Sequence, residues 1–258
     1  LNPNIDAKKL KKISTGRNED KFGMSEKNFI YLVNKYKKSS SLRIRCLSVH
    51  IGSQILDHHP YSKMIKVINK VIMKSKHQFE FIDLGGGMGI NYDLKSKSLN
   101  YKKYNFEIQK LLKKHNAKII FEPGRSIIGD TAILITKVIY VKSSPKKNFI
   151  ILDAAMNDFM RPALYGSFHR IIPLRKKKNI VKKIHDFVGP VCETTDRFSN
   201  LEKYQKIYEN DYLAICDVGA YGIVLASNYN LRVKPAEVIV DKSNFKIISK
   251  REDINKII

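Results

Sequence analysis

The chain has 258 residues, a length that allows one large domain or two smaller ones. A hydrophobic fraction of 43% is enough for a packed core and excludes general disorder. The net charge of +24 is compatible with a basic polyanion-binding protein. However, nucleic-acid recognition favours the bidentate guanidinium of arginine, and only 10 of the 48 basic residues are arginines. The lysines are scattered along the sequence. A solvated basic surface is therefore the preferred interpretation, and polyanion binding stays an alternative.

The three cysteines, Cys46, Cys192 and Cys216, are far apart and have neither metal-ligand nor redox-motif spacing. They indicate free thiols in a reducing compartment, and Cys216, inside an apolar strand pattern, is predicted to lie in the core. No apolar run approaches the roughly 20 residues of a membrane span, and no signal peptide is recognisable. These features favour a cytoplasmic protein that binds neither nucleic acid nor membrane. The first residue is Leu1 and not Met, which suggests that the natural start is missing.

Helices and strands alternate in the first half of the chain. Ser25 is a favourable N-cap, and apolar residues then recur at one-face helical spacing over 29–36. Further helices are predicted over 65–72 and 108–112. Strands are predicted over 42–49, 79–82 and 118–121. Strands separated by helices in this way indicate a parallel sheet built from βαβ units.

After Gly129 the pattern changes to strands with few long helices between them. The clearest of these strands are predicted over 133–141, 149–152, 212–215 and 237–240. The pattern predicts a second, all-β domain. The domains are therefore expected to span 1–128 and 129–258, with the boundary near 128–131.

Two predicted strands of the first half end in glycine-containing turns. Glycines occupy 85–87 after one strand, in a segment that does not fit the dinucleotide fingerprint, and Gly124 follows the next strand within 122–125. Backbone N–H groups with no Cβ beside them can surround a phosphate, and β/α-barrels commonly bind phosphates at the loops after their last two strands. Either turn alone can be explained as a tight turn that requires glycine. Two such turns after adjacent strands predict a phosphate-binding site.

His50 and Glu122 each stand where a predicted strand ends. A histidine there is usually a packing residue, but an imidazole could also stack on a planar cofactor while the Ser53 hydroxyl reaches its phosphate. Glu122 is either an edge carboxylate bound to backbone or the group that holds a pyridinium N–H. His58 and His59 are interpreted as a solvated loop pair with no metal role, since no third ligand stands at a suitable spacing.

Cys192 lies in a Gly-Pro loop beside Glu193 and Asp196. Acidic neighbours raise the pKa of a thiol, which disfavours a nucleophile and suits a proton donor. Earlier in the chain, Arg161 and Tyr165 could bind a substrate carboxylate. Taken singly, Arg161 is better explained as a surface ion pair.

These motifs, in this order, resemble the diaminopimelate decarboxylase branch of the alanine-racemase-fold, pyridoxal-phosphate-dependent decarboxylases. The resemblance extends from Ile13-Ser14-Thr15-Gly16 to Pro235-Ala236-Glu237-Val238, and it is most specific over 153–165 and 189–193. It implies a β/α (TIM-like) barrel that carries pyridoxal 5′-phosphate, followed by a β-barrel or sandwich domain. It also implies a head-to-tail homodimer whose sites are shared across the interface. Residues 1–128 would then be the C-terminal portion of the barrel.

The resemblance assigns roles residue by residue. Cofactor contacts would come from His50, Ser53, Gly85, Gly86, Gly87, Glu122, Pro123, Gly124, Arg125 and Tyr221. Among these, His50 would stack on the pyridoxal ring and Glu122 would bind the pyridine nitrogen. The substrate would be held by Arg125, Arg161, Tyr165, Glu193 and Tyr221. Cys192 would be the proton donor, offered with Glu193 to the partner subunit's site.

The chain departs from the family pattern in two places. Thr194-Thr195 precede Asp196 where the family usually has a small residue or Gly. The family's cofactor-bearing lysine, in a Y-x-x-K-A-type motif on an early barrel strand, has no counterpart in the sequence. A full β/α-barrel needs about 250 residues, and only about 128 precede the β domain. Roughly the first half of the barrel is therefore expected to be absent, and the chain alone is expected to be inactive.

The resemblance implies decarboxylation of meso-2,6-diaminopimelate to L-lysine and CO2. A sister enzyme acting on ornithine, arginine or carboxynorspermidine is the alternative, although ornithine-type enzymes carry Asp after the Cys. Glu193, with Arg161 and Tyr165, suits a substrate that has both an amine and a carboxylate at its far end. A basic polyanion-binding protein is the second alternative.

Overall fold

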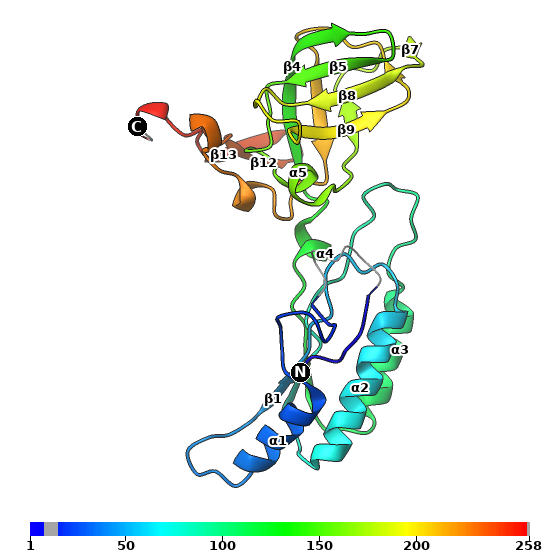
Figure 1. Cartoon of the computed structure of the whole chain (residues 1–258), viewed down its shortest axis with the longest axis vertical. Helices are drawn as coiled ribbons and strands as arrows, with labels where there is room; N and C mark the ends of the chain where they lie inside the picture. Colours follow the sequence, from blue (N-terminus) through cyan, green and yellow to red (C-terminus); the bar gives the residue numbers. More distant parts are fainter. Residues whose placement is uncertain (8–14, 257–258) are drawn as a thin grey trace. The chain divides into compact units, whose positions relative to one another are not determined.

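The computed structural model describes residues 1–7 and 15–256. Ile13 and Ser14, at the start of the family resemblance, lie outside these described residues. The chain divides into two compact units, Leu1–Ile127 and Ile128–Ile258 (Figure 1). The division falls beside the boundary expected near 128–131.

The first unit contains a three-stranded parallel sheet. Its strands, hydrogen-bonded in chain order, are β1 (Cys46–Ser48), β2 (Phe81–Asp83) and β3 (Lys118–Ile120). The predicted parallel sheet is confirmed, but the first strand is shorter than the expected 42–49. The Arg45 carbonyl still accepts the N–H groups of Glu80 and Phe81, so the chain runs beside β2 for one residue before regular pairing begins.

Three helices accompany this sheet: α1 (Glu26–Tyr36), α2 (His59–Ser75) and α3 (Tyr101–Leu112). The predicted N-cap is confirmed, since the Ser25 side chain accepts the Asn28 N–H at 3.3 Å. Helices α2 and α3 lie side by side, with the rings of Tyr61 and Tyr104 stacked at a centroid distance of 4.4 Å (Figure 1).

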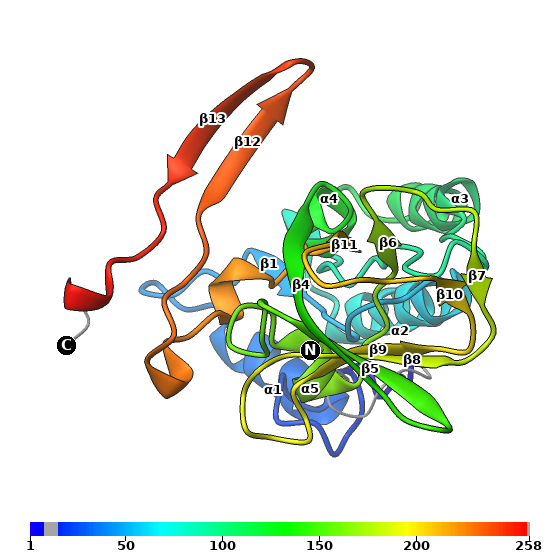
Figure 2. The ribbon, with the colours of Figure 1, turned by 90° about the horizontal axis from the view of Figure 1, so that it is seen from above.

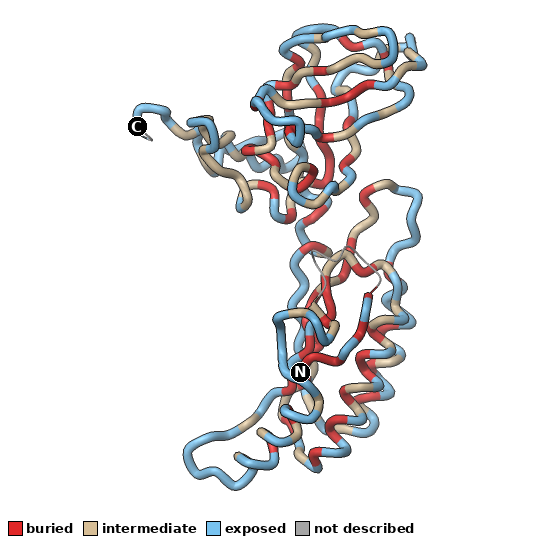
Figure 3. Tube along the Cα trace, viewed as in Figure 1, coloured by how far each residue is buried: buried red, intermediate tan, exposed pale blue. Residues whose placement is uncertain are grey.

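The core of the first unit lies between the sheet and these helices. Leu47 and Ile82 of the strands are fully buried, as are Ile68 and Val71 of α2. Buried positions recur along α2 and α3 at the spacing of one helix face (Figure 3). Each such side chain contributes about 1.5–3 kcal/mol by leaving water, which fixes the helices against the sheet and so places the strand ends.

The second unit is built around a six-stranded sheet with the order β6-β11-β4-β5-β8-β9. The strands are β4 (Ile133–Ser143), β5 (Lys147–Leu152), β6 (Ile171–Pro173), β8 (Ile184–Val188), β9 (Arg197–Leu201) and β11 (Tyr212–Cys216). Neighbouring strands are antiparallel except β5 and β8, which are parallel. Val138, Ile150, Phe187 and Leu213 form the centre of its core. The predicted β-rich second half is confirmed.

Short elements complete the two units. They are α4 (Arg125–Ile128), α5 (Arg161–Tyr165), the 3-10 turns η2 (Ile223–Leu225), η3 (Tyr229–Leu231) and η4 (Ile254–Lys256), and the antiparallel pair β7 (Ile180–Val181) and β10 (Tyr204–Gln205). The last strands, β12 (Glu237–Asp241) and β13 (Asn244–Ser249), form an antiparallel hairpin with mostly exposed side chains (Figure 2). Among the described residues, no helix is long and apolar enough to cross a bilayer.

Candidate active site

The glycine turn after β2 brings the ends of the three parallel strands together. The Gly86 N–H donates to His50 Nδ1 at 3.2 Å, and the Glu122 N–H donates to the Gly85 carbonyl at 2.9 Å. A Cβ on Gly85 would lie 2.5 Å from the Val49 carbonyl oxygen, and the Gly85 backbone has a φ of +64°. Only glycine accepts both conditions without strain. The structure thus brings together His50, the glycines and Glu122, as the sequence predicts.

Two side chains that the sequence interpretation did not include hold this turn. Asp83 accepts the Gly85 N–H through Oδ1 at 2.8 Å and the Ser48 hydroxyl through Oδ2 at 2.9 Å. The Tyr61 hydroxyl donates to the Gly86 carbonyl at 3.0 Å from a fully buried position. Burial raises the pKa of Tyr61 well above its usual value, so its hydroxyl stays a neutral donor. Together these contacts make the turn a rigid feature of the sheet edge.

Arg125 lies at the first residue of α4 and is buried. It donates through Nη2 to Ser53 Oγ at 3.0 Å and through Nη1 to the Tyr92 hydroxyl at 2.7 Å. The guanidinium also lies 5.8 Å from the centroid of the Tyr92 ring. Ser53 and Arg125, which were expected to serve the same cofactor, are therefore in direct contact. A guanidinium beside a hydroxyl suits an anionic oxygen group.

These residues fit a phosphorylated planar ring. The side chains of His50 and Glu122 are exposed and available as a flat imidazole and a carboxylate. A Cβ on Gly124 would meet no heavy atom within 4 Å, so a ligand can approach the backbone of the second turn closely. The Gly85 and Gly86 N–H groups already donate to Asp83 and His50, so phosphate oxygens would be bound by other N–H groups of the two turns, the Ser53 hydroxyl and the Arg125 guanidinium.

Cys192 and Glu193 lie in the loop that joins β8 to β9. The buried carboxylate of Asp196 anchors the loop by accepting the Val191 N–H at 2.8 Å and the Met156 N–H at 2.7 Å. Burial raises the pKa of Asp196, and these two hydrogen bonds oppose that rise. Asp196, expected to act on the thiol, thus turns its carboxylate toward backbone N–H groups. The Cys192 side chain is exposed at the loop.

The Glu193 carboxylate is held by two hydroxyl groups. Tyr229, in η3, donates to one oxygen in a short hydrogen bond, and Thr195 donates to the other at 3.1 Å. The pKa of Tyr229 is raised because its hydroxyl donates this hydrogen bond to Glu193 and because the carboxylate is negatively charged. Tyr229 was not among the predicted site residues. Its contact links the loop to the chain segment that follows Tyr221, a predicted site residue that is itself exposed.

Arg161 opens α5 and is buried, so the expectation of a surface ion pair is wrong. Its Nη1 lies 2.7 Å from His169 Nε2, and His169 Nδ1 lies 2.9 Å from the Cys216 carbonyl oxygen. Because that carbonyl can only accept, His169 carries its proton on Nδ1 and presents Nε2 to the guanidinium. Tyr165, at the other end of α5, is half-buried. Cys216 is buried, as predicted for a core residue.

A second arginine that the sequence interpretation missed supports the segment before α5. Arg232 donates to the Asn157 side-chain oxygen at 2.8 Å, to the Asp153 carbonyl at 2.6 Å and to Asp158 at 3.4 Å. Asp158 in turn accepts the Ala155 N–H at 2.8 Å. The irregular segment expected to carry substrate contacts is therefore fixed by charge-assisted hydrogen bonds.

Residues 1–129 match the family model of the pyridoxal binding domain of pyridoxal-dependent decarboxylases. The diaminopimelate decarboxylase of Aquifex aeolicus is 38% identical over 265 residues, which cover 100% of this chain and 62% of the relative. That of Zymomonas mobilis is 37% identical over 261 residues, with the same coverage. The chain thus spans less than two thirds of the length of these relatives.

Solved structures agree with this comparison. The crystal structure of diaminopimelate decarboxylase from Helicobacter pylori complexed with L-lysine has a TM-score of 0.92 and 38% identity, and the match covers 100% of this chain and 64% of that one. The diaminopimelate decarboxylase of M. jannaschi has a TM-score of 0.88 and 32% identity, with 100% of this chain and 61% of that one covered. The predicted fold class, part of a β/α-barrel followed by a β-rich domain, is confirmed.

Proposed function

Because the chain belongs to the family of pyridoxal-dependent decarboxylases, we propose that it serves the decarboxylation of meso-2,6-diaminopimelate to L-lysine and CO2, the last step of lysine biosynthesis. Four of the diaminopimelate decarboxylases it resembles are 36–38% identical over 99–100% of its length. The arginine decarboxylase and lysine/ornithine decarboxylase with similar folds are only 22% and 20% identical, which supports the fold alone.

The cofactor in this proposal is pyridoxal 5′-phosphate, held by the first unit. The phosphate would be bound by Ser53, Arg125 and the backbone of Gly87 and Gly124, while Gly85 and Gly86 shape the first turn and Pro123 shapes the second. His50 would lie against the ring, and Glu122 would keep the pyridine nitrogen protonated. When bound, the cofactor supplies an electron-poor ring that takes up the charge left by CO2 loss. The contacts among His50, Gly86 and Glu122 support this assignment.

The substrate would be recognised at both ends by charged groups. Glu193 would bind the ammonium group at the far end, while Arg161, Tyr165 and Tyr221 would bind the far carboxylate. Glu193 is held by Tyr229 and Thr195, so it keeps one orientation toward the ammonium group, which ornithine also has. The observation that carries the choice of diaminopimelate is therefore the buried Arg161 guanidinium, because only a substrate with a second, distal carboxylate would pair with it.

The final proton would come from the Cys192 thiol. As the Cys192 Sγ–H bond breaks, the proton forms the new C–H bond of the product, and the thiolate must then recover a proton from solvent. The exposure of Cys192 supports this exchange with solvent. We further propose a homodimer in which this loop reaches the partner subunit's site, and a cytoplasmic location, where free thiols persist.

The substrate proposal is tested by assaying CO2 release from meso-diaminopimelate and from L-ornithine with the complete gene product. We expect a clear preference for diaminopimelate. Glu193→Asp, which keeps the charge but withdraws it by one methylene, should raise KM for diaminopimelate more than it lowers kcat. A clear preference of the unmodified enzyme for ornithine would overturn the proposal. DNA binding with a steep salt dependence and no decarboxylation would favour the polyanion alternative.

A further inference from the structure

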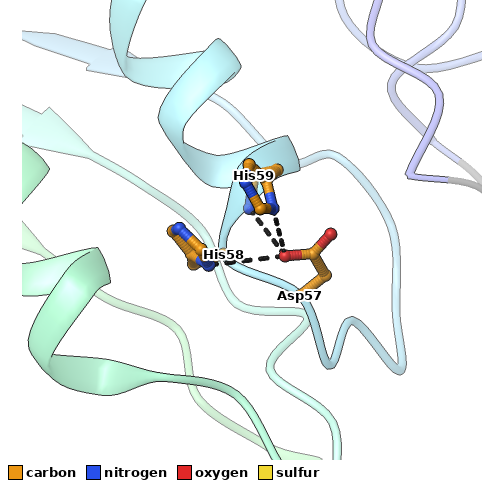
Figure 4. Close-up of side chains that lie close together, drawn as sticks. All are labelled: Asp57, His58 and His59. Atoms are coloured by element: carbon orange, nitrogen blue, oxygen red, sulfur yellow. Dashed lines mark hydrogen bonds and ion pairs between the residues drawn. The ribbon is translucent and has the colours of Figure 1, made fainter. Parts of the chain in front are cut away.

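Asp57, His58 and His59 form a compact cluster at the N-terminal end of α2 (Figure 4). One Asp57 carboxylate oxygen lies 2.7 Å from His59 Nδ1 and 3.4 Å from His58 Nδ1. The three ligand atoms all lie within 4.8 Å of one another. None of these residues belongs to the proposed cofactor or substrate sites, so the cluster stands apart from the proposed function.

The separations match those around a small metal ion. Zinc binds imidazole nitrogen and carboxylate oxygen at about 2.0–2.2 Å, and two ligand atoms of a tetrahedral site then lie about 3.3 Å apart. The 3.4 Å separation agrees with that value, whereas the 2.7 Å separation is a hydrogen bond whose proton a bound ion would replace. Small side-chain rotations would therefore bring all three atoms into a coordination shell.

The orientation of the rings is not dictated by sequence proximity. Consecutive residues of a helix point about 100° apart. The ring centroids of His58 and His59 nevertheless lie 4.1 Å apart, and the ring planes make an angle of 39°. Both imidazoles turn Nδ1 toward Asp57 (Figure 4). Two imidazole nitrogens thus converge on one carboxylate oxygen.

The backbone of the cluster is fixed before any ion binds. Asp57 accepts the His59 N–H at 3.1 Å, and Ser62 donates its N–H to the His58 carbonyl at 2.9 Å. Pro60 follows at the start of the helix, where its ring restricts φ. The His58 side chain is 16% exposed, whereas those of Asp57 and His59 are 60% and 71% exposed. One ligand is therefore held by its surroundings, and the other two leave the site open to solvent.

We propose that Asp57, His58 and His59 bind a first-row transition-metal ion such as Zn2+, with two imidazole nitrogens, one carboxylate oxygen and a remaining position for water. Mixed nitrogen and oxygen donors select zinc, nickel or copper over magnesium or calcium. The partial positive charge at the start of α2 opposes a cation, and the Asp57 carboxylate offsets it. Asp57, directly before the histidine pair, supplies the third ligand atom that the sequence interpretation did not count.

The test is calorimetric titration of Zn2+ into the untagged chain. The Cys46→Ser and Cys192→Ser background is needed, since exposed thiols also bind zinc. We expect one equivalent to bind, and we expect His59→Ala to lower the affinity by at least about tenfold, since even outer-shell changes cost that much. The matched control is His77→Ala, whose imidazole contacts the Ile44 carbonyl instead.

Asp57 also accepts the backbone N–H of His59, the first residue of α2, so removing its side chain weakens the start of the helix. Asp57→Asn keeps an oxygen for the His59 N–H and removes only the charge, and circular dichroism establishes that the variant is folded. We expect Asp57→Asn to lower zinc affinity by at least about tenfold. Copper electron paramagnetic resonance should show nitrogen couplings from two imidazoles, falling to one in His59→Ala. Unchanged zinc affinity in folded His59→Ala and Asp57→Asn, or an equal loss in His77→Ala, would overturn the proposal.

Discussion

The backbone of Gly86 packs directly against that of Glu122: a Cβ on Gly86 would lie 2.1 Å from the Glu122 carbonyl oxygen. The first residue belongs to the turn after β2, and the second follows β3. Two neighbouring strands of a parallel sheet thus meet backbone to backbone at their carboxyl ends. Ligands of open and barrel α/β sheets bind at this end of the strands.

Gly86→Ala should therefore destabilise the chain by about 1–3 kcal/mol, since the neighbouring carbonyl belongs to backbone and cannot rotate away. Gly124→Ala is the matched control, because its Cβ would meet nothing within 4 Å. It should change stability by less than about 0.5 kcal/mol. Urea unfolding followed by circular dichroism measures both. Equal effects of the two substitutions would show that the turn relaxes more easily than its packing implies.

Asp196→Ala should unfold the loop that carries Cys192. The substitution leaves the Val191 and Met156 N–H groups without their buried acceptor, at about 1–3 kcal/mol each. Asp196→Asn, which can keep only one of the two hydrogen bonds, should have a smaller effect. Hydrogen exchange at the two amides locates the loss. Protection of both amides in Asp196→Ala would contradict the anchoring role.

The buried His185 should make the chain less stable in mild acid. Burial lowers the pKa of His185, which is 1% exposed and bonded through Nδ1 to the Lys183 carbonyl. Between this lowered pKa and the ordinary value of about 6.5, the unfolded chain binds more protons than the folded one, so the free energy of unfolding falls as pH falls. His185→Gln should flatten the dependence seen in urea unfolding between about pH 7.5 and 5. An unchanged slope would exclude His185 as its source.

Cys192→Ala in the complete gene product should lower turnover by roughly 10²–10⁴, the usual contribution of a positioned acid. Cofactor binding, measured by the absorbance of the bound ring, should be unchanged. Cys46→Ala is the control, since Cys46 is also a free, exposed cysteine but lies in β1, outside the proposed machinery. Turnover near that of the unmodified enzyme would show that Cys192 is not the proton donor.

The 258-residue chain alone should not capture pyridoxal phosphate covalently. The sequence holds no lysine in the family's cofactor-bearing motif, and Ile127 and Phe121 beside the proposed phosphate-binding site are exposed apolar residues that favour aggregation. Borohydride treatment of the purified chain with the cofactor, followed by mass spectrometry, should find no specifically modified lysine. One lysine modified in high yield, together with turnover, would show that a lysine outside the family's motif can bind the cofactor covalently, and would contradict this prediction.

The order of strands and helices in the first unit was predictable because apolar spacing reports which face is buried. The positions at which the helices begin were harder to predict. Helix α2 begins at His59, well before the expected 65, since Pro60 at its start was not used as a signal. Helix α3 begins after Asn100, although a helix was expected only over 108–112. The Asn100 side-chain oxygen caps it by accepting the Lys103 N–H at 2.9 Å.

The positions of His50, the glycines at 85–87 and Glu122 were predictable because each follows the end of a strand. Tyr92 and Tyr229 were not. Tyr92 contacts Arg125 across 33 positions of sequence, and Tyr229 contacts Glu193 across 36. Neither stands in a local pattern that distinguishes it from other tyrosines. Such pairs exist only through tertiary packing, which periodicity does not encode.

The anchoring of the loop between β8 and β9 by Asp196 has an evolutionary consequence. The residues that hold the loop, Gly189 and Asp196, stand at its two ends, while Cys192 to Thr195 between them are exposed. Surface positions tolerate exchange with little loss of stability. Selection could therefore exchange the reactive and recognising groups at the centre of the loop while its attachment stays constant. The same framework can in this way acquire a new substrate without refolding.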